Sequence, residues 1–199
     1  RDLHLSIRRQ RQMCIRDSSH WYHPGYMRQK MEQSLINLKI DCVDLLYLHH
    51  CNFGKNDEYF DDALDEICRF KEEGKVKFTG ISDWDLVKIM KFIERANPDV
   101  VQPYRNIFED TYKSSGLQNY IEENDRGVCF FSPLMHGLLT GKYAQPVDFP
   151  EGDFRKNISA FQDKSIISLF QKNAELLKNK FNEHSNPVMH GVIDALASD

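Results

Sequence analysis

Short apolar segments recur along this chain at intervals that match the length of a strand–helix repeat. They begin near residues 43, 76, 100 and 128, so the intervals are 33, 24 and 28 residues. Each segment is long enough for a strand and too short for a helix. Between and around them lie stretches with helical spacing of apolar residues, at 26–38, 61–70, 85–95 and 117–124. A strand–helix alternation with short connections predicts a parallel α/β sheet.

Polar residues follow these strands directly. His49, the pair Ser82-Asp83, Gln102 and Ser132 each come at the end of an apolar segment. In a (β/α)₈ TIM-type barrel these positions line one mouth, where the active site lies. Such a barrel needs eight strands and about 250 residues, whereas this chain has 199 residues and four predicted strands. The sequence therefore predicts a partial barrel of about four βα units, and no GxGxxG motif indicates a Rossmann domain instead.

Composition limits the kinds of binding partner and the cellular location that we expect. The net charge of −4 and the pI near 6.1 give no expectation of nucleic-acid binding. The longest nearly charge-free stretch, 127–141, is too short to span a bilayer, so we expect no membrane partner. Five cysteines without a CxxC spacing are typical of reduced thiols, which favours a cytoplasmic location.

Two local features carry their own hypotheses. The consecutive residues His49, His50 and Cys51 could suggest a metal site. Neighbouring side chains on an extended chain point in opposite directions, so we predict no metal. Residues 1–18 are rich in arginine and lack periodicity, so we interpret them as an unrelated or artefactual tail before a partial barrel at 19–199. A nucleic-acid or membrane role for this tail is the competing interpretation.

Five motifs in order resemble the aldo-keto reductase family. They cover roughly residues 27–183, and their order and spacing make the resemblance specific. The motifs are SLINLKIDCVDLLYLHH (34–50), GKVKFTGISDW (74–84), VVQPYRN (100–106), FFSPLMHGLLTGKY (130–143) and the weaker GDFRKNISAF (152–161).

The resemblance implies an enzyme that transfers hydride from NADPH, less often NADH, to a small carbonyl substrate, giving an alcohol. His49 occupies the place of the family's catalytic histidine, which polarises the carbonyl. The family's Asp, Tyr and Lys come from strands that we do not find in this chain, and Tyr22 and Lys30 match no motif. General acid catalysis is commonly worth about 10² to 10⁴ in rate, so we expect this chain alone to be nearly inactive.

The resemblance also implies a set of cofactor residues. Ser82 and Asp83 match a Ser-Asn pair that binds the nicotinamide carboxamide, with the departure that a carboxylate only accepts hydrogen bonds. Gln102 matches a second carboxamide ligand, and Phe131 an aromatic that stacks on the nicotinamide, although Phe131 also suits a barrel core. A loop around the pyrophosphate matches Ser132, Pro133, Leu134, Met135, His136 and Lys142, and Arg155 follows it. Lys142 also suits a solvated surface.

One alternative function lies within the same family. A non-enzymatic, cofactor-binding regulator that resembles the potassium-channel β-subunits would use the same cofactor residues. Some of those proteins replace the active-site histidine, so His49 favours an enzyme. The sequence gives no expectation for the oligomeric state.

Overall fold

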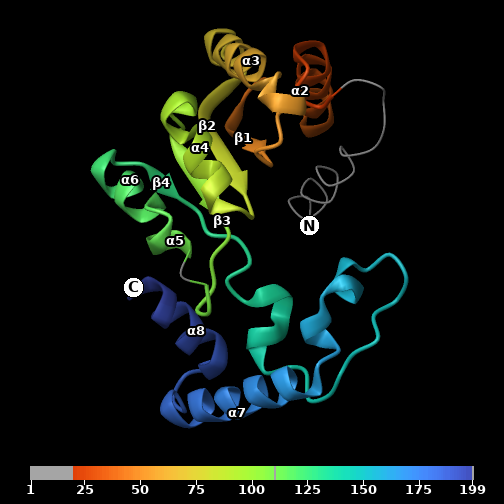
Figure 1. Cartoon of the computed structure of the whole chain (residues 1–199), viewed down its shortest axis with the longest axis vertical. Helices are drawn as coiled ribbons and strands as arrows, with labels where there is room; N and C mark the ends of the chain where they lie inside the picture. The colour runs from red at the N-terminus through yellow and green to blue at the C-terminus, as the bar shows by residue number, and fades with distance from the viewer. Residues whose placement is uncertain (1–19, 110, 199) are drawn as a thin grey trace. The chain divides into compact units, whose positions relative to one another are not determined.

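A computed structural model describes residues 20–109 and 111–198 (Figure 1). The predicted tail, 1–18, lies outside the described residues. The described residues form two compact units. The first contains the residues up to Pro103 together with Asn119–Cys129, and the second contains Tyr104–Gln118 and the residues from Phe130 onward. Each unit is described by itself.

The first unit is a four-stranded parallel sheet whose strands alternate with helices (Figure 1). The strands pair in the order β1-β2-β3-β4, and each pairs in parallel with the next along the chain. This confirms the predicted partial α/β barrel. The elements are α2 (Pro24–Leu38), β1 (Val43–His49), the 3₁₀ turn η2 (Lys55–Asp57), α3 (Phe60–Glu72), β2 (Val76–Asp83), α4 (Leu86–Ala96), β3 (Val100–Pro103) and β4 (Gly127–Val128).

Local sequence explains where α4 begins and ends. The Asp85 side chain caps its first turn by accepting hydrogen bonds from the main-chain N–H groups of Val87 and Lys88, at 3.0 and 3.3 Å. The helix ends at Asn97, which adopts a left-handed conformation with φ 41°. Its apolar face, with Ile89 and Ile93 fully buried, packs on the sheet.

The fourth strand is shorter than predicted. The apolar run at 128–131 predicts a strand through Phe131, but the ladder with β3 joins only Val100 to Gly127 and Val101 to Val128. Partner β3 has only four residues, and its last residue, Pro103, has no N–H to donate. Phe131 instead forms an isolated parallel bridge with Tyr104, within the second unit.

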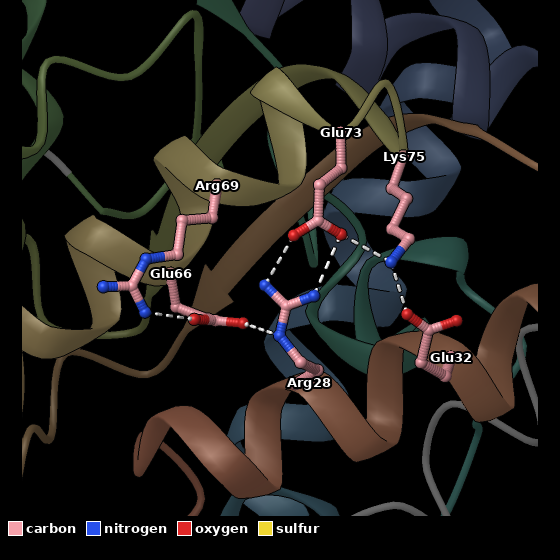
Figure 2. Close-up of polar contacts among 6 residues, drawn as sticks. All are labelled: Arg28, Glu32, Glu66, Arg69, Glu73 and Lys75. Carbon is pink, nitrogen blue, oxygen red and sulfur yellow. Dashed lines mark hydrogen bonds and ion pairs between the residues drawn. The ribbon is translucent and has the colours of Figure 1, made fainter.

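An ion-pair network joins α2 to α3 near the amino end of β2 (Figure 2). Arg28 on α2 lies at its centre, 2.8 Å from Glu73 and 2.7 Å from the buried Glu66, the latter as an ion pair rather than an aligned hydrogen bond. Lys75 joins Glu73 to Glu32 of α2. Hydrogen bonds from Arg28 and then Lys75 lower the pKa of Glu73 to about 2. Beside the network, Met31, Leu35, Phe70 and Val76 form an apolar cluster.

The second unit is built from short helical segments around two longer helices. The 17-residue α7 (Lys164–Lys180) is capped by Asp163, and α8 (Pro187–Ala197) begins with proline at its first turn. At Gly191 a Cβ would lie 2.7 Å from the Leu177 side chain, so glycine allows α7 and α8 to approach closely. The remaining elements are α5 (Thr111–Ser114), η3 (Met135–Thr140), η4 (Phe154–Asn157) and η5 (Ser159–Phe161), and α6 (Leu117–Glu123) runs from this unit into the first.

Within the described ranges, no helix has the length and apolar character needed to cross a membrane.

Candidate functional site

Three predicted site residues lie in one row across the first unit. The strand register pairs His49 of β1 with Ser82 of β2, and Ser82 with Gln102 of β3. All three lie at the carboxyl ends of parallel strands, the level at which active sites occur in α/β barrels. The structure therefore brings together His49, Ser82 and Gln102, as the sequence predicts.

The row directly beneath shows which way these side chains point. Tyr47 pairs with Gly80, and Gly80 with Val100, two residues before each member of the site row. A Cβ at Gly80 would lie 2.4 Å from the Tyr47 ring, so both positions lie on the same face of the sheet. Because side chains alternate along a strand, His49, Ser82 and Gln102 share this face, which we call the site face.

Ser82 and Gln102 are joined by a hydrogen bond. The Ser82 hydroxyl donates to Gln102 Oε1 at 3.2 Å. Ser82 is only 1% exposed, whereas Gln102 is half-buried. With its oxygen accepting from Ser82, Gln102 has its Nε2 amide group as the end that can donate to a ligand. The pair thus presents an oriented amide donor, which suits the carbonyl oxygen of a carboxamide.

His49 is exposed on the site face, and its electrostatic surroundings favour the neutral ring. Partial burial of the imidazole and then the neighbouring His50 lower its pKa, while the charge of Asp83 opposes this shift. A neutral imidazole carries one N–H donor and one acceptor nitrogen. Near neutral pH, His49 can therefore donate a hydrogen bond to a carbonyl oxygen.

The chain leaves the strand abruptly after His49. His50 has φ 66°, a left-handed conformation that is costly for a residue with a side chain. The expectation that His50 points away from His49 is wrong, since the centroids of the two rings lie 4.0 Å apart. The left-handed backbone of His50 explains the difference from an extended chain. No group of three or more metal-ligating side chains occurs in the part of the chain that the structure describes.

Tyr22, in the segment before α2, holds this turn, although it matches no motif in the sequence. Its ring is buried against Phe53, and its hydroxyl lies 2.9 Å from the carbonyl oxygen of His49 and 2.7 Å from that of His50. The two hydrogen bonds span 27 and 28 positions of the sequence, and no sequence motif indicates them.

Asp83 lies differently from its expected place beside Ser82. As the next residue along β2 it is on the opposite face of the strand, and it is 5% exposed. One carboxylate oxygen accepts from the main-chain N–H of Cys51 at 2.6 Å, and the other from that of Asp85 at 2.9 Å. Both oxygens are thus engaged by the protein itself. A contact between Asp83 and a cofactor stays a prediction.

The remaining predicted cofactor residues belong to the second unit. Phe131 is half-buried; its carbonyl accepts from the main-chain N–H of Arg105, and its ring packs edge-on against Tyr104. Leu134 and Met135 pack their side chains into an apolar cluster with Leu139 and α8. Contact of these two residues with a cofactor would therefore come from their main chain.

The loop at 132–141 has an unusual backbone. Ser132, Met135 and His136 adopt positive φ values of 59°, 46° and 57°, and Gly137 and Gly141 have φ values of 100° and 71°. Residues in such conformations cluster at functional sites. Within the loop, the N–H groups of Met135 and Gly137 already donate to the carbonyl oxygens of Ser132 and Leu134, and Pro133 has no N–H, so an anion-binding role of this loop stays a prediction.

Two basic side chains, Lys142 and Arg155, were predicted to contact the cofactor, and they lie in different settings. Lys142 is exposed, with its ammonium group 5.7 Å from the centre of the Tyr143 ring. Arg155 is held by Asp153, with Nε 2.9 Å from Oδ1, and it lies over the ring of Phe149. This pairing lowers the pKa of Asp153 to about 2. The exposed Lys142 ammonium group can contact a ligand that binds from solution, whereas Arg155 already has a carboxylate partner.

Comparisons with known protein sequences find related proteins. The sequence model of the Aldo/keto reductase family matches residues 13–191. The aldo-keto reductase yakc of Schizosaccharomyces pombe, which is named for NADP(+), is 32% identical over 156 residues, 77% of this chain and 44% of that protein. L-galactose dehydrogenase of Arabidopsis thaliana is 31% identical over 57% of this chain and 37% of its own length. The chain spans about half the length of the curated relatives it matches.

Solved structures show the same fold. The glycerol dehydrogenase AKR11B4 of Gluconobacter oxydans superposes with a TM-score of 0.71 at 26% identity, covering 90% of this chain and 52% of that one. The holo form of the aldo-keto reductase AKR11C1 of Bacillus halodurans gives 0.52 at 24% identity over 66% of this chain and 41% of its own, which supports the fold alone. The match to the family model covers most of the sequence, and on that ground this chain belongs to the aldo/keto reductase family.

Proposed function

We propose that this chain supplies the histidine and part of the cofactor site of an enzyme that reduces a small aldehyde or ketone with NADPH, or less readily NADH. The observation that carries the proposal is the row of His49, Ser82 and Gln102 at the carboxyl ends of three adjacent parallel strands. The family membership and the relative named for NADP(+) support the cofactor class.

The residues present suit a nicotinamide group. Gln102, oriented by Ser82, would hold the carboxamide through its Nε2 donor. The family resemblance, rather than the placement of the two units, leads us to propose Phe131 for the ring and Lys142 for the phosphates. NAD(P)H bound in such a site supplies the hydride.

His49 would hold the substrate carbonyl in this proposal. Its neutral imidazole donates one hydrogen bond to the carbonyl oxygen, which draws electron density away from the carbon. The same hydrogen bond fixes the carbonyl relative to the site face. Tyr22 does not serve as the acid, because its hydroxyl is engaged with the carbonyl groups of His49 and His50. We place no proton donor among the residues of this chain, so we expect the chain to bind the cofactor with little turnover of a carbonyl substrate.

Cofactor binding tests the proposal directly. We would titrate the chain with NADPH, follow the cofactor fluorescence, and repeat the titration with Gln102→Ala. Loss of one hydrogen bond to the ligand should raise Kd by about three- to thirtyfold. Gln33→Ala, which removes an exposed glutamine from α2, is the matched control and should bind as the wild type does.

Two outcomes would overturn the proposal. One is the absence of saturable NADPH binding in a chain whose circular dichroism shows it to be folded. The other is an unchanged Kd in Gln102→Ala. Binding that depends on Gln102, with no carbonyl reduced even when the family's Tyr and Lys are supplied by the complete protein, would favour the non-enzymatic regulator.

A further inference from the structure

The turn that follows His49 is strained, and several hydrogen bonds hold it. His50 adopts φ 66°, which costs a non-glycine residue about 1 kcal/mol or more. Its N–H donates to the carbonyl of Ser82 at 2.9 Å, and its own carbonyl accepts from Tyr22 at 2.7 Å. Such a conformation persists only where its surroundings determine it.

The buried carboxylate of Asp83 makes the shortest of these contacts. It accepts from the Cys51 main-chain N–H at 2.6 Å, one residue beyond the strained position. Its other oxygen accepts from Asp85 N–H at 2.9 Å, which anchors the carboxylate at the start of α4. Burial and then the Asp83 charge raise the pKa of the Cys51 thiol, so this group stays protonated and is also a donor toward Asp83.

This donor set explains why a carboxylate suits the position. The two main-chain groups that bond to the Asp83 carboxylate, those of Cys51 and Asp85, are donors, and a carboxylate only accepts. An asparagine would satisfy one main-chain N–H and place its own NH₂ group against another. A buried charge is tolerated when hydrogen bonds of this kind compensate for its desolvation.

We propose that Asp83 is a positioning residue for His49, acting through the Cys51 amide to hold the turn that follows β1, with Tyr22 as the second anchor. Asp83 reaches the turn from β2, and Tyr22 reaches it from the segment before α2. The two anchors engage opposite polarities of the main chain, since Asp83 accepts from an N–H group and Tyr22 donates to carbonyl groups. Together they fix both sides of the strained residue. The importance of His49 itself rests on the proposed function.

The test compares two carboxamide substitutions two residues apart. Asp83→Asn replaces one of the two acceptors by a donor, whereas Asp85→Asn keeps an equally good helix cap and is the matched control. In Asp83→Asn we expect hydrogen exchange of the Cys51 amide to accelerate by about ten- to a hundredfold. The His49 ring signals in a histidine-labelled NMR sample should also shift or broaden. Asp85→Asn should leave both measurements as in the wild type.

Tyr22→Phe keeps the experiment decisive if Asp83→Asn does not fold. This variant keeps the buried ring and loses the two hydrogen bonds to the His49 and His50 carbonyls. We expect the His49 signals to broaden or shift in it. Unchanged His49 signals in a folded Asp83→Asn variant, or in Tyr22→Phe where the first does not fold, would overturn the inference.

The readout separates this inference from the proposed function. If NADPH binds to the wild type and His49 is unaffected in Asp83→Asn, the positioning role is wrong and the proposed function stands. If His49 is affected but the wild type does not bind NADPH, the positioning role stands and the proposed function is wrong.

Discussion

Replacing Gly80 with alanine tests the packing of the row beneath the candidate site. The added Cβ would lie 2.4 Å from two ring carbons of Tyr47 and 2.8 Å from the carbonyl oxygen of Val100, whereas ordinary Cβ contacts begin at 3.4 Å. The half-buried Tyr47 ring can turn aside. The Val100 oxygen belongs to β3 and moves only with the strand, so the substitution must push β2 and β3 apart or tilt them.

The expected cost follows from these two contacts. Overpacking of a tight site costs about 1–3 kcal/mol. Replacing glycine also lowers the conformational entropy of the unfolded chain, which offsets the loss in stability by about 0.4–1 kcal/mol. The free energy of unfolding should therefore fall by about 1–2 kcal/mol. With urea slopes of about 1–3 kcal/mol/M for small proteins, the midpoint should fall by about 0.3–2 M.

Urea denaturation followed by circular dichroism measures this change, with Gly25→Ala as control. Gly25 lies in the first turn of α2, and a Cβ there meets only the His23 ring, at 3.5 Å. Alanine favours the helix, so the control should unfold at the same or a higher urea concentration. A second background, Tyr47→Ala, removes the ring contact, and Gly80→Ala should cost less there. A midpoint for Gly80→Ala at or above that of the wild type would refute the reasoning.

Two further predictions concern charged groups. Glu66→Gln should lower the free energy of unfolding by about 1–2 kcal/mol, because the buried carboxylate pairs with Arg28 and Arg69. Both arginines keep some access to water, which limits the loss. Equal urea midpoints for the variant and the wild type would contradict this prediction. In a carboxyl NMR titration, Asp153 should titrate near pH 2. Its pKa in the folded state lies below that in the unfolded state. The stabilisation from its pairing with Arg155 is therefore present above about pH 4 and is lost as the pH falls through 2. Asp153 titration near pH 4 would show that the ion pair does not form.

The sequence predicts the framework of this fold well, because local patterns determine it. The helix expected at 61–70 occurs at Phe60–Glu72, and the strand expected to begin near residue 43 occurs at Val43–His49. Apolar spacing and acidic residues at a helix start act within a few positions, so they can be read from one sequence. The row of site residues follows in turn, because parallel strands end at the same level.

Contacts between distant segments explain what the sequence could not give. Tyr22 and Asp83 act on the turn after His49 from 27 and 32 positions away, and only the folded chain brings them there. The left-handed His50 has no local signal, since histidine is not a residue that requires this conformation. The early end of β4 depends on Pro103 of its partner strand rather than on its own apolar residues.

The ion-pair network of Figure 2 lies at the opposite end of β2 from the site row. Lys75 directly precedes Val76, and the eight residues of β2 separate it from Asp83 by about 25 Å. This distance exceeds the Debye length of about 8 Å at physiological salt, so charge changes in the network are screened from His49. Ion-pair networks stabilise proteins more strongly as the temperature rises. Charge substitutions at the amino ends of the strands can therefore change the thermal stability without changing the electrostatics around His49.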